Sequence, residues 1–437
     1  MLAVLRGIWY NDLIMERELT ADQENAKKLI TEWFLNTDNR VFVLAGYAGT
    51  GKTFLINHVV QDVLHLKAGS EAVFVTPTGK AATVLIKNGT VAGTVHSLIY
   101  TRDEDDFDVD ENGEVVERET LSFTKKEKID EKIRLIIVDE ASMIGEDVLR
   151  DLLSFDVKCL FSGDNAQLPP VNGTCGLLEH PDYMLTEIVR QASDNPIIQV
   201  ATLAREGKSI PYGNYGDKVC VVGKNFLSPA ERKRIFLKAD QIICGRNKTR
   251  VALNREIRGY KGIDESALLP VEGEKLICTL NDWEKPLDKE GNFHLVNGII
   301  GTGSNIRESM DFLASMDFLA SMDFKADFAD ESVWVPFDTA VFTEGRYAHA
   351  YGDRAVKLID GTVVHESNFA LLHQLKSVSE EPICRFEFAY AVTCHKAQGS
   401  EFDFVVVFDE SWAFGGERNR WLYTAITRAR EKLLIIR

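Results

Sequence analysis

The feature that most constrains this chain is a glycine-rich octapeptide set between an apolar run and an amphipathic stretch. The apolar residues 41–45 (VFVLA) are followed by residues 46–53 (GYAGTGKT). This order predicts a buried strand, a phosphate-binding loop and a helix. Glycines let successive backbone N–H groups face a polyphosphate, and the start of the helix adds its positive dipole end. The segment therefore predicts a nucleoside triphosphate site rather than a purely structural glycine turn.

Two side chains of this loop have a defined chemistry. Lys52 can reach the β and γ phosphates, and the Thr53 hydroxyl can ligate Mg²⁺. The residues of the loop that we expect to bind the nucleotide are Gly46, Ala48, Gly49, Thr50, Gly51, Lys52 and Thr53.

A second motif supplies carboxylates. Residues 134–138 (RLIIV) form an apolar run typical of a parallel strand covered on both faces, and Asp139 and Glu140 follow it directly. Asp139 is predicted to hold Mg²⁺ and Glu140 to polarise the attacking water. An acidic pair alone is often a solvated loop, but the phosphate loop favours the catalytic interpretation.

Composition limits the class of protein. At 437 residues and 45% hydrophobic content, the chain can bury two or three cores. No apolar stretch is long enough to span a membrane, and the N-terminal segment carries acids and lacks a cleavage site typical of a secretory signal. We therefore expect a cytoplasmic protein. Its seven scattered cysteines contain no Cys-x-x-Cys pair, which predicts reduced packing residues rather than disulfides or zinc.

The net charge of −17 argues against a broad nucleic-acid-binding surface, because phosphate contacts dominate such affinity. Much of the acid lies in one block, residues 102–119 (RDEDDFDVDENGEVVERE). A nucleic-acid site on this chain must therefore be a local groove.

The pattern along the chain predicts an α/β fold with two parallel-sheet core domains, because strand-like runs alternate with helical stretches. A helical stretch begins after Pro196 and marks the boundary between the cores. The expected strands lie in residues 41–45, 72–77, 133–140, 158–164, 241–247, 402–410 and 432–437.

Two inserts interrupt this scheme. Residues 100–130 contain Asn112-Gly113 between charged arms, which predicts a β-hairpin, and residues 270–390 predict a small β-rich subdomain. Within the latter, SMDFLA repeats over residues 309–324, which we interpret as a duplicated loop or short helix, with an interaction segment as the alternative. The expected domains are residues 1–99 with 131–192, residues 193–269 with 391–437, and the inserts 100–130 and 270–390.

Further motifs occur in a specific order. They are residues 19–23 (LTADQ), 76–82 (TPTGKAA), 94–97 (TVHS), 163–170 (GDNAQLPP), 185–190 (LTEIVR), 393–401 (TCHKAQGSE) and 423–429 (YTAITRA). From about residue 19 to its end, the chain resembles superfamily 1 helicases, most closely the RecD-like, phage Dda-like branch. The resemblance implies two RecA-like cores, a hairpin insert in the first and a small SH3-like β-barrel in the second.

The resemblance also assigns roles around ATP and Mg²⁺. It implies that Gln23 contacts the adenine edge, that Gln167 senses the γ-phosphate, and that Glu401 accepts from the ribose. Arg190 and Arg428 resemble the arginines that reach the phosphates from the second core, where a fixed charge stabilises the transferring group. The single-strand contacts that it implies are Thr76, Pro77, Thr78, His96, Ser97, Asn247, Thr393 and His395.

The activity that the resemblance implies is ATP-dependent movement on single-stranded DNA, 5′ to 3′, with unwinding of duplexes that carry a single-stranded tail. A monomer is expected, with single-strand-binding, replication or recombination proteins as possible partners. The hairpin departs from the family pattern because its acidic block should repel a duplex end, although Phe107 or Phe123 could act as the wedge. Two alternatives stay open: an ATP-gated DNA-binding or remodelling module, and a motor subunit of a recombination or nuclease complex. The motifs do not discriminate DNA from RNA.

Overall fold

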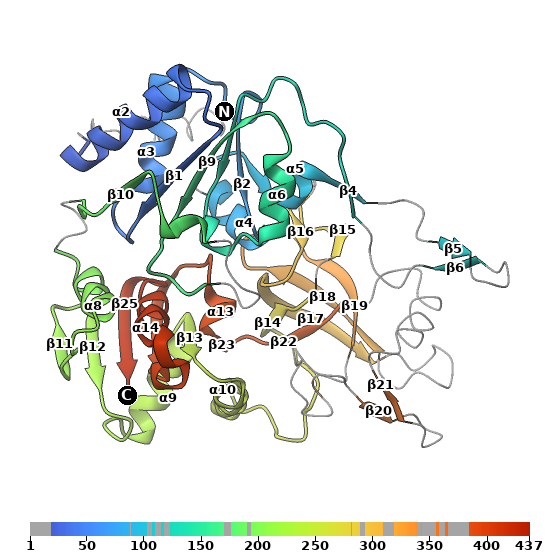
Figure 1. Ribbon diagram of the computed structural model, residues 1–437. Helices are drawn as coiled ribbons and strands as arrows, with labels where there is room; N and C mark the ends of the chain where they lie inside the picture. Colours follow the sequence, from blue (N-terminus) through green and yellow to red (C-terminus); the bar gives the residue numbers. More distant parts are fainter. Residues whose placement is uncertain are drawn as a thin grey trace, which may run out of the picture.

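The computed structural model describes residues 19–437 except 88, 103–106, 110–114, 118–122, 170–175, 190–193, 281, 289–292, 309–318, 339–341, 343–354, 358–362 and 366–383. Two six-stranded sheets and one five-stranded sheet organise the described part (Figure 1). No helix within it is long and apolar enough to cross a bilayer.

The first core is a parallel sheet in the order β10-β1-β9-β8-β2-β3. Both faces are covered, since Phe42 and Leu44 pack into one hydrophobic cluster while Val43 and Ala45 pack into another. The strands are β1 Val41–Gly46, β2 Ala72–Thr76, β3 Ala92–Thr94, β8 Leu135–Val138, β9 Lys158–Gly163 and β10 Tyr183–Leu185. The helices are α2 Ala21–Asn36, α3 Lys52–His58, η1 Val59–Val63, α4 Gly79–Lys87, α5 Val95–Ile99, η2 Ala141–Met143, α6 Glu146–Leu153 and η3 Leu177–Glu179.

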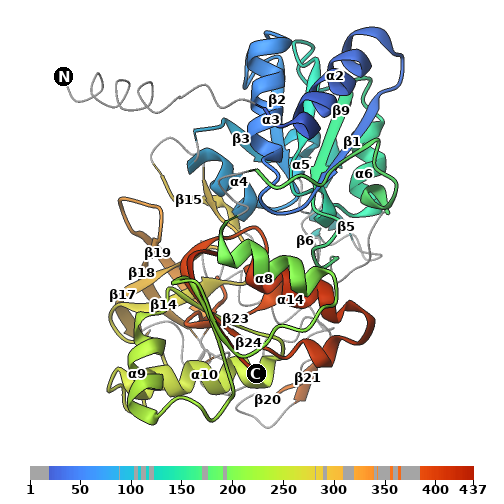
Figure 2. The same ribbon diagram turned by 90° about the vertical axis from the view of Figure 1, so that its left-hand side faces the viewer.

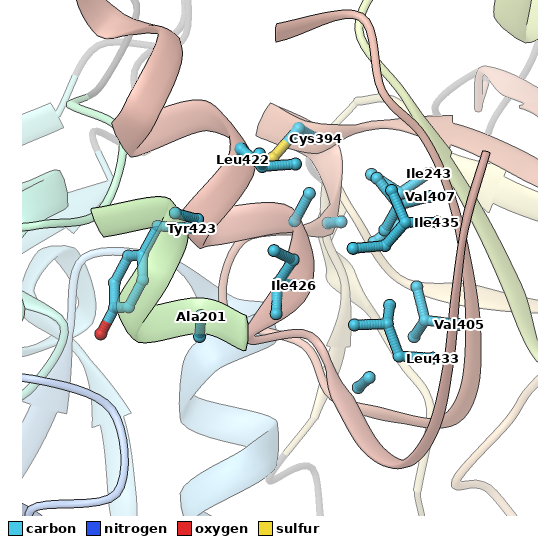
Figure 3. Packing of buried hydrophobic residues seen from close by; sticks show 14 of the residues in the cluster. Ala201, Ile243, Cys394, Val405, Val407, Leu422, Tyr423, Ile426, Leu433 and Ile435 are labelled. Atoms are coloured by element: carbon cyan, nitrogen blue, oxygen red, sulfur yellow. The ribbon is translucent and has the colours of Figure 1, made fainter. Parts of the chain in front are cut away.

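The second core has the order β11-β12-β25-β24-β13-β23 and is parallel except for the β11-β12 pair. Figure 3 shows Ala201 and Ile426, from two helices, beside Val405 and Leu433 of the sheet. The strands are β11 Gly213–Tyr215, β12 Val219–Val222, β13 Gln241–Cys244, β23 Ala391–Thr393, β24 Phe402–Phe408 and β25 Ala429–Ile436. The helices are α8 Pro196–Arg205, α9 Pro229–Lys238, α10 Asn247–Tyr260, α13 Cys394–Ala397, η4 Ser411–Glu417 and α14 Arg418–Ile426. In Figure 2, α8 and α14 lie on the side of this core that faces the first core.

The prediction of two parallel-sheet cores is therefore confirmed. Each of the seven predicted apolar runs overlaps one of these strands, and the helix expected after the boundary is α8.

A third, antiparallel sheet has the order β19-β18-β17-β14-β22. Its strands are β14 Glu274–Cys278, β17 Ile300–Glu308, β18 Leu319–Ala326, β19 Val333–Asp338 and β22 Phe386–Phe388. Two small antiparallel pairs accompany it, β15 Asp282–Pro286 with β16 His294–Leu295 and β20 Ala355–Lys357 with β21 Val363–His365. The SH3-like character of this insert stays a prediction.

The SMDFLA repeat was predicted as a loop or short helix, and for its described part this prediction is wrong. Residues 309–318 lie outside the described residues, but Leu319–Ala326 is the strand β18. Ala320, Met322 and Phe324 are buried at every second position. A six-residue period is a multiple of two, so each copy can direct the same residue types to the same face of a strand.

The hairpin insert is present as two antiparallel pairs. One pair is β4 Tyr100–Arg102 with β7 Phe123–Lys125, and the other is β5 Phe107–Val109 with β6 Val115–Glu117. Figure 1 shows β5 and β6 projecting from the body of the molecule. The predicted turn at Asn112-Gly113 lies outside the described residues.

A buried ion-pair network joins the second core to the third sheet. Glu387 of β22 accepts from Arg250 Nη1 of α10 at 2.7 Å and from Lys396 Nζ of α13 at 2.5 Å. The side chains of Glu387 and Arg250 are 3% and 5% exposed. The carboxylate therefore neutralises two cations, of which Arg250 has little access to water and Lys396 is 27% exposed.

Replacing Glu387 with Gln should lower the free energy of unfolding by about 3 kcal/mol, because the buried Arg250 and the partly buried Lys396 lose their counter-charge. The pKa of Lys396 is already lowered by burial, so loss of its proton should limit the damage. Chemical unfolding followed by tryptophan fluorescence measures the change.

Asp403→Asn is the matched control, since the Arg430–Asp403 pair is more than half exposed at both partners. It should change the unfolding free energy by less than about 1 kcal/mol. Equal effects of the two variants would contradict the importance of the buried network.

Candidate functional site

The phosphate loop connects β1 to α3 and has the backbone geometry that the motif predicts. Gly49 and Gly51 have φ values of 81° and 75°, in the region that favours glycine. A side chain at Gly51 would also bring a Cβ to 2.6 Å from Nε2 of Gln23. The loop therefore requires its glycines, both for the turn and for close packing against α2.

The side chain of Lys52 folds back along this loop. Its Nζ donates to the carbonyl oxygens of Gly46 at 2.7 Å and Tyr47 at 3.2 Å. The ammonium group is thereby held at the loop, next to backbone N–H groups that can bind phosphate.

The acidic pair lies beside the loop. The hydroxyl of Thr53 donates to Oδ2 of Asp139 at 3.3 Å, so the two expected Mg²⁺ ligands converge from the start of α3 and from the end of β8. Glu140 has a φ of 52°, a strained conformation for a residue with a side chain. Desolvation raises the pKa of Glu140, and the charge of Asp139 raises it further.

The second core contributes Arg428 from the end of α14. Its guanidinium is almost fully buried and donates to the carbonyl oxygens of Thr424 at 3.1 Å and Ser400 at 3.2 Å. These bonds fix its orientation, while its charge faces Glu140, whose pKa it lowers in part.

These groups line one pocket of about 360 Å³ between the cores. Of the residues expected to bind or hydrolyse ATP, it brings together Ala48, Gly49, Gly51, Lys52, Thr53, Asp139, Glu140, Gln167, Glu401 and Arg428. Gly46 and Thr50 belong to the loop without lining the pocket, and Arg190 lies outside the described residues.

Gln23 lies behind the phosphate loop, whereas most of the other residues expected to bind ATP line the pocket. It is buried at the start of α2, where its Nε2 donates to the carbonyl oxygen of Thr50 at 2.9 Å and its Oε1 accepts from the Thr20 N–H at 3.1 Å. It braces the phosphate loop and closes a capping box. The pocket lining does not include it, so its contact with adenine stays a prediction.

The residues expected to contact single strands lie at the carboxyl ends of strands in both cores. In the first core, Thr76 ends β2 and its hydroxyl donates to the Thr78 carbonyl at 2.8 Å, with Pro77 between them. His96 and Ser97 lie on α5 and line a second pocket of about 370 Å³, which Phe293 and His294 close from the side of β16.

In the second core, Thr393 ends β23, the parallel neighbour of β13, and pairs in register with Cys244. His395 follows on α13, and Asn247 begins α10. A hydrogen bond of 2.8 Å from Lys80 Nζ to the Lys396 carbonyl joins α4 to α13, so the two groups of expected contacts belong to adjoining segments.

Burial favours the neutral form of the two histidines. It lowers the pKa of both His96 and His395 below the ordinary value. Hydrogen bonding and ring packing are therefore favoured over charge in any contact they make with a nucleic acid.

The structure adds residues that the sequence interpretation did not assign. Asp164 and Thr427 line the nucleotide pocket, and so do Tyr47 and Phe54. Asp164 and Thr427 belong to the motifs at residues 163–170 and 423–429. Their position in these motifs was the feature of the sequence from which their place in the pocket could have been predicted.

Two family models match the chain in tandem. One, described as an AAA domain, matches residues 18–221, and the other, a UvrD-like helicase C-terminal domain, matches residues 388–436.

Three curated relatives align with nine-tenths or more of the chain. The ATP-dependent RecD2 DNA helicase of Deinococcus radiodurans is 28% identical over 90% of this chain and 46% of its own length. An uncharacterised protein of Methanocaldococcus jannaschii, MJ1519, is 25% identical over 95% of this chain and 38% of its length. The chain thus spans less than half of these two relatives. The RecD subunit of the RecBCD enzyme of Buchnera aphidicola is 22% identical over 91% of this chain and 70% of its length.

Among solved structures, Bacteroides Pif1 bound to ssDNA is 20% identical, covering 96% of this chain and 92% of its own with a TM-score of 0.45. Pif1 helicase from Candida albicans is 17% identical, with coverages of 96% and 95% and a TM-score of 0.43. The two family models, in this order along the chain and together with the RecD relatives, support a superfamily 1 helicase of the RecD/Pif1-like kind.

Proposed function

We propose that this chain is an ATP-driven motor that moves 5′ to 3′ along single-stranded DNA and unwinds duplexes carrying a single-stranded tail. The observation that carries the proposal is the shared pocket: Lys52 and Glu140 come from one core and Arg428 from the other. Hydrolysis that needs all three can proceed only when the cores are together. ATP binding and product release would then close and reopen the cleft.

The chemistry follows from the groups that face the pocket. Lys52 and the backbone N–H groups of the loop would bind the phosphates of ATP, and Glu140 would orient and deprotonate the attacking water. Mg²⁺, held by the oxygens of Thr53 and Asp139, would neutralise charge on the phosphoryl oxygens. Oxygen donors are the ligands that Mg²⁺ prefers, and these two converge within 3.3 Å. In this proposal Gln167 would sense the γ-phosphate, Arg190 would reach the phosphates and Glu401 would accept from the ribose.

The strand would lie across both cores, on the residues named above at the carboxyl ends of β2, β13 and β23. Hydroxyl and amide groups bind phosphates without sequence preference, and the neutral histidines can pack against bases. The lowered pKa of each histidine supports this interpretation.

A second candidate function is favoured by the acidic insert. Residues 102–119 concentrate negative charge on the hairpin that would meet a duplex end. Repulsion there favours a translocase or ATP-gated module that unwinds poorly by itself or acts within a recombination complex.

Glu140→Gln should reduce single-strand-stimulated ATP turnover by about 10²–10⁴-fold, because it removes the base that activates water. Binding of a fluorescent ATP analogue should survive. Glu146→Gln, at an exposed position on α6, is the control and should retain the turnover of the unmodified protein. Full activity of Glu140→Gln would contradict the role of this carboxylate.

Arg428→Ala should lower the same rate by about 10³-fold, since an arginine from the second core would no longer stabilise the transferring phosphoryl group. The matched control is Arg430→Ala, because Arg430 lies close by in the sequence but is 54% exposed. Steady-state hydrolysis with and without single-stranded DNA measures both. Equal rates in the two variants would place the catalytic cation elsewhere.

Polarity is tested with duplexes that carry a tail at one end. A 5′ tail should support unwinding and a 3′ tail should not. Unwinding from the 3′ tail alone would reverse the proposed direction. Strand-dependent ATP turnover without unwinding of either substrate would favour the second candidate function.

A further inference from the structure

The hydroxyl of Tyr423 joins two loops of the first core although the residue belongs to the second. Tyr423 lies on α14 and is 2% exposed. The backbone N–H of Ala48 donates to the hydroxyl oxygen at 2.7 Å, and the hydroxyl donates to Oδ2 of Asp164 at 2.6 Å. Figure 3 shows the ring extending away from Ile243, Val407 and Ile435, with the hydroxyl at the end remote from the apolar cluster.

The direction of these hydrogen bonds is fixed. A tyrosine hydroxyl has one proton to donate, and the carboxylate of Asp164 can only accept. Burial, followed by the charge of Asp164, raises the pKa of Tyr423, so the hydroxyl keeps its proton. The chain of bonds therefore runs from the Ala48 N–H through the Tyr423 hydroxyl to the Asp164 carboxylate, and each bond polarises the next.

Asp164 begins the segment that carries Gln167. Its other carboxylate oxygen accepts from the Ala166 N–H at 2.9 Å, which fixes the turn before Gln167. On the far side, the Leu168 N–H donates to Thr424 Oγ1 at 2.9 Å, and its carbonyl accepts from Gln398 Nε2 at 2.8 Å. Residues 164–168 are thus held at both ends by side chains of the second core.

We propose that Tyr423 is a positioning residue that couples the phosphate loop to the Gln167 segment when the two cores close. The proposal rests on the proposed motor function. The bridge exists only while the cores are in contact, since its central atom comes from α14 and both of its ends from the first core. Opening the cleft releases the Ala48 N–H and the Asp164 carboxylate together, and closing the cleft sets the loop and the segment in one step.

The test is Tyr423→Phe, which removes a single oxygen atom and keeps the ring. The rate of ATP hydrolysis is measured against ATP concentration, with and without saturating single-stranded DNA. We expect kcat with DNA to fall about tenfold or more, the scale of losing a hydrogen bond to a charged group. KM for ATP should change less than about twofold, because the Tyr423 hydroxyl is not itself a phosphate ligand and the substitution leaves every N–H group of the loop in place. The ratio of DNA-stimulated to unstimulated rates should fall with kcat.

Tyr260→Phe is the matched control, because it removes a hydroxyl that donates to a carboxylate, Glu256, at 2.6 Å on α10. Its stimulation ratio should equal that of the unmodified protein. Thr424→Val is a second variant of the bridge region, since it takes away the acceptor of the Leu168 N–H while keeping the side-chain shape. It should lower kcat with DNA in the same way, and thermal unfolding midpoints identify any variant that has lost its fold.

The outcomes separate the two proposals. If the unmodified protein shows no stimulation by DNA, the motor function fails. If it is stimulated and Tyr423→Phe matches Tyr260→Phe, the motor stands and the coupling role of Tyr423 is overturned. A rise in KM of tenfold with unchanged kcat would also overturn it, because that result describes a residue that only helps to bind ATP.

Discussion

The nucleotide pocket depends on one constraint, the contact between α13, α14 and the loops of the first core. Arg428 would be remote from Glu140 without it, and Gln167 would lose the support on either side of its turn. The contact combines hydrogen bonds with a small apolar part, in which Leu168, Ala48 and Ala166 of the first core pack on the cluster of α8 and α14. The two hydrophobic clusters inside the first core are separate from that cluster, and a hydrogen bond contributes only about 0.5–1.5 kcal/mol net. Such an interface can therefore open and close while the clusters inside the first core stay intact.

The Glu387 ion pairs and the Tyr423 bridge differ in how much charge they bury, and we expect the first connection to be permanent and the second to be reversible. Glu387 binds Arg250 and Lys396 within the second core and its inserted sheet, where separation would leave charges in a poorly solvated site. The Tyr423 bridge uses one neutral hydroxyl and one carboxylate, which water can satisfy when the cleft opens. The second core and the third sheet are thus expected to move as one body, while the first core moves against them.

Local patterns in the sequence were sufficient to predict much of the fold and of the candidate site. The phosphate loop and the apolar run before Asp139 are contiguous, so strand and turn chemistry predicts them directly. Strands of three or four residues such as β3, β10, β12 and β23 were missed, because so short a run has no distinct periodicity before its neighbours pair with it. The Tyr423 bridge was not predictable, since Ala48 lies 375 residues away and nothing in the local pattern indicates the contact. The SMDFLA repeat was wrongly interpreted as a loop or short helix, because its six-residue period was not recognised as an even period, which suits a strand.

An acidic protein can bind a polyanionic partner when its cations gather at the binding site. Lys80 is buried where α4 meets α13, and burial lowers its pKa to about 7, with the charges of Lys275, Arg428 and Lys396 adding to the effect. The charges of Lys275, Arg428 and Lys396 all act on Lys80, so cationic groups gather where both ATP and a nucleic-acid strand would bring phosphates. The acidic block, residues 102–119, belongs to a different segment of the sequence, the hairpin insert. The net charge of the whole chain therefore does not describe this local site, and binding of phosphates depends on the cations beside α4 and α13.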